Sequence, residues 1–195
     1  MQRYRQACND VVGGEPVNLS TALKISAAFV AELEPCCHRI AVAGSIRRGK
    51  PQVGDLDIVL IPKMVAAPKA GLFDQGETVM AIDAALTALA HESRIRLVSD
   101  GPKIKRGVFI KSVAADFEFD LYVADELTWT TLMLIRTGSK ESNIRLCKRA
   151  QDLGMKLKAD GSGVVAANGE LIRCETEADV YAALGLDFVQ PVARD

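Results

Sequence analysis

Two short segments decide the fold and the candidate site of this chain: residues 43–49, with the sequence AGSIRRG, and residues 54–62, with the sequence GDLDIVLIP. The second segment is typical of a buried strand that opens on two carboxylates. Because successive side chains of a strand alternate between its faces, Asp55 and Asp57 project from one face with their Cα atoms about 7 Å apart. Such a pair can hold hard divalent cations, and two cations about 4 Å apart assist phosphoryl-type displacement.

The Gly-Ser turn that precedes this strand has the residues of a phosphate-binding loop. Gly44 lets the backbone approach a ligand closely, Ser45 offers a hydroxyl and an N–H group, and Arg48 offers a planar fork for phosphate oxygens. A purely structural alternative is that the two acids cap a strand and the arginines lie in a solvated loop. The joint pattern favours a site, because each motif alone is far less specific.

Composition limits the class of protein. The chain has 195 residues, 49% hydrophobic content and a formal net charge of -1, so any contact with nucleic acid must come from local positive charge. No apolar run reaches the length of a membrane span and no signal peptide is evident, so we expect a cytoplasmic protein. The five cysteines include no Cys-x-x-Cys pair, which indicates reduced thiols, and Cys36-Cys37-His38 is a poor zinc motif.

The periodicity of apolar residues predicts an α+β chain. We expect a polar lead-in over residues 1–15, a loop over 63–76 and a small ribbon over 155–174. Helices are predicted over residues 18–33, 77–92, 127–135, 140–153 and 176–184, and strands over 39–43, 55–62, 95–98, 104–113 and 116–123. The last three strands are predicted to be antiparallel neighbours.

The strand predicted over residues 116–123 supplies a candidate third carboxylate. Asp116 and Glu118 are explained by a strand face turned to water. Asp120 differs, because a strand beside Asp55 and Asp57 brings it within reach of the same cations. It is then the natural acceptor for the proton of an attacking hydroxyl.

Several motifs in this order resemble those of family X, the polymerase beta-like DNA polymerases of the nucleotidyltransferase superfamily. The resemblance runs from about residue 18 to the C-terminus. It rests on residues 44–49 and 54–57, on Asp120, on TGSKESN at 137–143, and on the closing segment 177–195.

The resemblance implies an α+β nucleotidyltransferase fold. A palm-like catalytic domain with a mixed or antiparallel sheet would span residues 1–124, and a thumb-like nucleotide- and DNA-binding lobe residues 125–195. The implied reaction transfers a dNMP from a dNTP to a primer 3′-hydroxyl with two Mg²⁺ ions, which Mn²⁺ can replace. We expect a monomer that acts on primer-template or gapped DNA in DNA repair, with no membrane partner, no lyase domain and no helix-hairpin-helix clamp.

Site residues follow from matching motifs and from local charge. The resemblance makes Asp55, Asp57 and Asp120 the catalytic and metal-binding residues. It makes the nucleotide-binding residues Gly44, Ser45, Arg48, Gly54, Thr137, Gly138, Lys140 and Asn143. Local positive charge makes Lys103, Lys105, Arg145 and Lys148 candidates for DNA contacts, with a solvated surface as the alternative, and Lys105 and Arg106 are expected to face opposite sides of their strand.

The chain departs from the family pattern at three places. It has Ile135-Arg136 where relatives show an aromatic pair, and Tyr122 and Cys147 where they often show arginine. Two other functions stay open. One is a nucleotidyltransferase that acts on RNA ends, a small molecule or a protein, and the other is a non-catalytic nucleic-acid-binding module.

Overall fold

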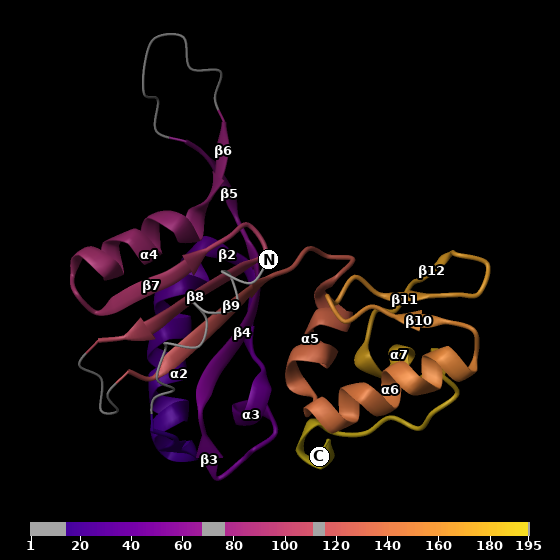
Figure 1. The fold of residues 1–195 in the computed structure, drawn as a ribbon. Coiled ribbons are helices and arrows are strands. Elements are labelled where there is room, and N and C mark those ends of the chain that lie inside the picture. Colours follow the sequence, from indigo (N-terminus) through magenta and orange to yellow (C-terminus); the bar gives the residue numbers. More distant parts are fainter. Residues whose placement is uncertain (1–14, 68–76, 111–115, 195) are drawn as a thin grey trace, which may run out of the picture.

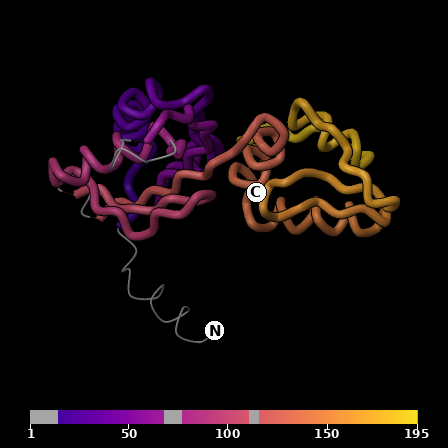
Figure 2. Tube along the Cα trace, turned by 90° about the horizontal axis from the view of Figure 1, so that it is seen from above, coloured from indigo at the N-terminus to yellow at the C-terminus, as the bar shows by residue number. Residues whose placement is uncertain are grey.

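A five-stranded mixed sheet forms the first of two lobes in the computed structural model, which describes residues 15–67, 77–110 and 116–194 (Figure 1). The chain enters the second lobe after the last strand of this sheet. From above, the two lobes lie side by side (Figure 2). The elements of the first lobe are β1 (Val17–Asn18), α2 (Leu19–Leu33), η1 (Glu34–Cys36), β2 (Cys37–Val42), α3 (Gly44–Arg47), β3 (Gln52–Val53), β4 (Asp55–Pro62), β5 (Met64–Ala66), β6 (Thr78–Met80), α4 (Ala81–His91), β7 (Ile95–Asp100), β8 (Ile104–Phe109) and β9 (Glu118–Val123).

The strand order is β2-β4-β9-β8-β7. β4 runs antiparallel to β2 and parallel to β9, whereas β8 runs antiparallel to both of its neighbours, β9 and β7. The predicted antiparallel arrangement of the last three strands is therefore confirmed. The predicted extension of β8 into residues 111–113 lies outside the described residues.

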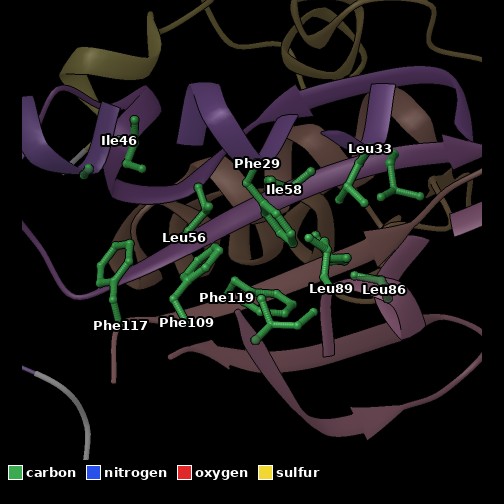
Figure 3. Close-up of a cluster of buried hydrophobic side chains, with 14 of the residues drawn as sticks. Phe29, Leu33, Ile46, Leu56, Ile58, Leu86, Leu89, Phe109, Phe117 and Phe119 are labelled. Carbon is green, nitrogen blue, oxygen red and sulfur yellow. The ribbon is translucent and has the colours of Figure 1, made fainter. Parts of the chain in front are cut away.

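One face of the sheet carries the main apolar core. Helices α2 and α4 cover this face, and their side chains pack on alternate residues of β4 and β9 (Figure 3). The Phe29 ring lies 4.9 Å from the rings of both Phe109 and Phe119, measured between centroids. Leu56 and Ile58 are fully buried in this core, as strand alternation predicts.

Capping residues fix the start of the main helices. The Asn18 side chain accepts a hydrogen bond of 2.9 Å from the Thr21 N–H and caps α2. The Ser139 hydroxyl accepts one of 3.0 Å from the Ser142 N–H and caps α6 in the same way. Both helices were predicted from their apolar spacing.

The loop predicted over residues 63–76 is wrong in part. β5 pairs with β6, with Met64 opposite Met80 and Ala66 opposite Thr78. As a consequence, α4 begins at Ala81 rather than at Glu77, because residues 78–80 are extended. Three-residue strands have too short an alternation to be read from sequence, and their pairing is decided by the chain around them.

The second lobe packs helices on a small sheet. Its elements are α5 (Trp129–Thr137), α6 (Lys140–Asp152), β10 (Lys156–Leu157), β11 (Val164–Val165), β12 (Leu171–Ile172), α7 (Glu177–Ala183) and η2 (Pro191–Ala193). The three strands form an antiparallel sheet in the order β10-β11-β12, which confirms the predicted ribbon. A cluster that includes Leu134, Leu146 and Val180 joins α5, α6 and α7.

Helix α5 also closes the other face of the large sheet. Trp129, Leu132 and Met133 pack on Val59 and Ile61 of β4, among other residues of the same cluster. The guanidinium of Arg39 on β2 stands 4.1 Å from the centre of the Trp129 ring. The part of this face that α5 leaves uncovered carries the acidic residues.

Two further features concern membrane-spanning helices and the cysteines. Among the described helices, none is both long and apolar enough to cross a membrane. The cysteines at 36, 37, 147 and 174 are free thiols. Of the lead-in predicted over residues 1–15, residues 1–14 lie outside the described residues.

Candidate active site

The parallel pairing of β4 with β9 brings the predicted carboxylates onto one face. Asp57 stands directly opposite Asp120, and Asp55 stands opposite Glu118. Side chains of paired residues in neighbouring strands point to the same side of a sheet, so all four acids project away from the Phe119 core. The alternation of residues 116–123 indicated only a water-facing role for Glu118, because its partner strand cannot be identified from that pattern.

The Gly-Ser turn lies against Asp57. The Ala43 N–H donates a hydrogen bond of 2.8 Å to the Asp57 carbonyl, and α3 begins at the next residue. Gly44 has a φ of +58°, and a Cβ atom placed there would overlap the Asp57 carboxylate. Only glycine therefore allows this backbone to lie so close to the acid. Gly54 is under no such restriction, since an added Cβ would meet nothing in the described structure within 4 Å.

The same turn holds buried polar atoms that lack a partner. Ser45 Oγ and Arg48 Nε are buried and form no hydrogen bond with any of residues 15–67, 77–110 and 116–194. Buried polar groups are nearly always hydrogen-bonded, and leaving one unpaired costs about 1–3 kcal/mol. A hydroxyl and a guanidinium nitrogen in this position suit an external anion such as phosphate.

Negative charge accumulates beside the turn. Burial, followed by the charges of Asp55 and Asp120, raises the pKa of Asp57 to about 7. The pKa of Asp55 is also raised, first by loss of water around its carboxyl group and then by the charge of Asp120. A bound cation stabilises this row of acids, Asp55, Asp57 and Asp120, because it removes the repulsion between their carboxylates.

Asp120 already has partners within the protein. The Tyr122 hydroxyl donates a hydrogen bond of 2.8 Å to Asp120 Oδ2, and Arg106 Nε forms an ion pair of 3.1 Å with Asp120 Oδ1. Within the described ranges, no three His, Cys, Asp or Glu side chains are gathered into a group that could hold a metal ion. The donor types and the excess of negative charge fit divalent cations, and the side-chain arrangement of Asp120 is set by Arg106 and Tyr122.

Comparisons with known proteins relate the second lobe to a described family. Residues 132–195 match the family model described as DNA polymerase beta thumb. This segment of the chain is similar to a polymerase beta thumb. The second lobe is hereafter called the thumb and the first lobe the palm, and the resemblance stated from the sequence is confirmed for the matched residues 132–195.

Solved structures support the fold of the whole chain. The crystal structure of Leishmania infantum polymerase beta in a ternary P/T complex has a TM-score of 0.76 at 19% identity, over 94% of this chain and 78% of that chain. The ternary gap complex of the same protein has a TM-score of 0.75 at 18% identity, over 93% of this chain and 71% of that chain. No curated protein matches the chain in sequence. The predicted α+β fold, with a palm-like sheet and a thumb-like lobe, is confirmed.

Two of the departures from the family pattern meet at the junction of palm and thumb. The guanidinium of Arg136, from α5, stands 4.1 Å from the centre of the Tyr122 ring on β9. Arg136 Nε is buried and has no hydrogen-bond partner in the described part of the chain. Tyr122 in turn donates to Asp120, so a cation–π contact links the thumb to the row of acids.

The predicted nucleotide-binding residues of the thumb lie together at the turn between α5 and α6. Thr137 is fully buried, its hydroxyl accepts a hydrogen bond of 2.7 Å from Arg47, and its carbonyl accepts one from Arg48. Asn143 Nδ2 donates a hydrogen bond of 2.7 Å to the Ile135 carbonyl, while its Oδ1 is buried without a partner among the described residues. Lys140 is exposed at the first position of α6, after the predicted Gly138 turn.

Of the four residues predicted to contact DNA, three are exposed and one is buried. Lys103 is exposed on the palm, and Arg145 and Lys148 are exposed on α6. Lys105 is the error: only 2% of it is exposed, and its ammonium group pairs with Asp83 at 2.7 Å and with Asp100. Burial opposes its charge, but the hydrogen bonds to these acids outweigh that effect and raise the pKa of Lys105.

A buried ion-pair cluster joins palm and thumb, and it was not predicted from the sequence. Arg47 donates hydrogen bonds of 2.7 and 3.1 Å to the two carboxylate oxygens of Glu177, and Arg194 donates one of 3.0 Å to Oε2. Burial alone raises the pKa of Glu177, but these hydrogen bonds outweigh burial and lower it. The only sequence signal is a pair of adjacent arginines, of which Arg48 alone was assigned to phosphate binding.

Proposed function

We propose that this chain is a small DNA polymerase of the family X type that fills gaps during DNA repair. The observation that carries the proposal is the pairing of Asp57 with Asp120 on one sheet face, next to a turn with unpartnered Ser45 and Arg48 atoms. The similar solved structures are named as ternary P/T and gap complexes of a polymerase beta, which supports DNA as the partner.

The acidic row would hold the metal ions. Asp55 and Asp57 would each contact two divalent cations, Mg²⁺ or Mn²⁺, and Asp120 one of them. When bound, such ions neutralise the transferring phosphate and orient the attacking and leaving oxygens. Carboxylate oxygens are the ligands that these hard cations prefer.

The remaining residues would position the nucleotide. Ser45, Arg48 and the Gly54 backbone would hold the triphosphate, with the Thr137-Gly138 turn at the sugar and Lys140 and Asn143 at the base. Asp120 would accept the proton of the primer 3′-hydroxyl while the new 3′-O–Pα bond forms. The bond between the α-phosphate and its bridging oxygen then breaks, and pyrophosphate leaves. Most of the acceleration in such in-line transfer comes from positioning and charge neutralisation.

A gap-filling assay tests the proposal. Purified protein with Mg²⁺ or Mn²⁺ is expected to extend a labelled primer across a one-nucleotide gap, and chelation of the metal is expected to stop extension. The variant Asp120→Ala should lose activity by at least about a thousandfold, since it removes both a ligand and the proton acceptor. Asp152→Ala, which removes an exposed acid at the end of α6, is the matched control and should retain activity.

The same assay separates the other functions. If the protein extends no primer on gapped, nicked or recessed DNA but transfers a nucleotide to RNA or a small acceptor, the polymerase proposal is wrong. The near-neutral net charge of -1 motivates that alternative. Binding of DNA without any nucleotidyl transfer would indicate a non-catalytic module. Offering dNTP and rNTP together tests whether Ile135-Arg136 still select the sugar.

A further inference from the structure

Arg106 occupies an unusual position for a cation. The antiparallel pairing of β8 with β9 places it directly opposite Asp120, which itself stands opposite Asp57. One row across three strands therefore carries two acids and an arginine, all on the face that holds the candidate active site. Its sequence neighbour Lys105 points to the other face and is buried there, as strand alternation predicts.

The guanidinium of Arg106 contacts both oxygens of Asp120. Its Nε lies 3.1 Å from Oδ1 and 3.2 Å from Oδ2. Tyr122 supplies a further hydrogen bond to Oδ2. These contacts occupy lone pairs on both carboxylate oxygens, so a metal ion at Asp120 competes with the arginine for them.

The Arg106 side chain is free enough to move. Its side chain is 50% exposed, whereas that of Asp120 is 19% exposed. Exposed ion pairs contribute little and exchange readily with other partners. The strand holds Asp120 in place, and the long arginine stem allows the guanidinium to swing into solvent.

We propose that Arg106 is a built-in cation that competes with the catalytic metal ion for Asp120. This inference rests on the proposed function, because it concerns the same acids. Arg106 acts as a positioning residue: it neutralises the third carboxylate when no metal is bound and raises the metal concentration at which the site fills.

Direct metal binding tests the inference without any catalytic turnover. Free Mn²⁺ is measured by electron paramagnetic resonance in a titration of the full chain, without DNA or dNTP. Arg106→Leu should bind Mn²⁺ about fivefold more tightly than the wild type, the effect expected for loss of one half-exposed competing charge. Arg106→Gln should show the same gain, and Arg106→Lys, which keeps the charge, should stay near the wild type.

Two controls sharpen the result. Arg96→Leu removes an equal charge from an exposed position on the neighbouring strand β7 and should leave Mn²⁺ affinity unchanged. Adding Asp120→Asn to Arg106→Leu should remove the gain. Melting curves identify variants that do not fold, and Arg106→Gln then replaces Arg106→Leu.

The outcomes distinguish the two proposals. Unchanged or weaker Mn²⁺ binding in both uncharged Arg106 variants overturns the role of Arg106 and leaves the polymerase proposal standing. An equal gain in Arg96→Leu also overturns it, because the effect would then be one of net charge. If neither the wild type nor any variant binds Mn²⁺, the metal site itself is wrong and both proposals fall.

Discussion

Glu177 connects the two lobes, and replacing it by glutamine should weaken the whole structure. The Glu177 side chain is 10% exposed and accepts hydrogen bonds from both Arg47 and Arg194, and the Arg194 side chain is fully buried. Glutamine keeps the shape but removes the negative charge between two guanidinium groups. Removing one partner of a buried ion pair costs about 3–5 kcal/mol, and the retained amide oxygen offsets part of this loss.

We therefore expect Glu177→Gln to lower the free energy of unfolding by about 3 kcal/mol. For a chain of this size, that loss lowers the melting temperature by about 6–12 °C. The matched control is Glu175→Gln, because the Glu175 side chain is 73% exposed and its ion pair with Arg173 lies at the surface. This control should change stability by less than about 0.5 kcal/mol.

Urea denaturation at several pH values checks the reasoning. The pKa of Glu177 is lower in the folded protein, so its contribution is fully present above the ordinary glutamate pKa of about 4.3. That contribution is lost as the pH falls through the folded value, and the wild type and Glu177→Gln should then converge. A difference below about 1 kcal/mol at pH 7, or one that grows in acid, refutes the role of this ion-pair cluster.

Two further substitutions test the geometry of the site and the corrected DNA surface. Gly44→Ala should abolish gap filling and cost at least about 2 kcal/mol of stability, because the new methyl group meets the Asp57 carboxylate at a positive φ, whereas Gly54→Ala should melt near the wild type. Lys105→Met should lower the melting temperature without changing DNA affinity in a gel-shift assay, since it leaves Asp83 and Asp100 without their buried partner. Lys148→Met should weaken DNA binding without lowering the melting temperature. It should also reduce the slope of log DNA affinity against log salt concentration by about one. Tighter DNA binding to Lys148→Met, or weaker binding to Lys105→Met, contradicts this assignment.

Much of the local structure could be predicted because its causes are local. The strand β4 runs from Asp55 to Pro62 as predicted, because an apolar run after two alternating acids is compatible with few structures other than a buried strand. The helix from Leu19 to Leu33 has its cap in the preceding residue and a proline soon after its end. The short hairpin of β5 and β6 was missed, because three residues carry almost no periodic signal.

The sequence by itself determined which side chains share a strand face and which chemistry they offer: Asp55 with Asp57, and Asp120 opposite in direction to its apolar neighbours. Only the tertiary structure decided the register that sets Asp57 against Asp120, the pairing of Asp120 with Arg106, and the burial of Lys105. The physical reason is that alternation follows from the geometry of one strand. Register, and the choice of face that the helices cover, depend on contacts between segments some sixty residues apart.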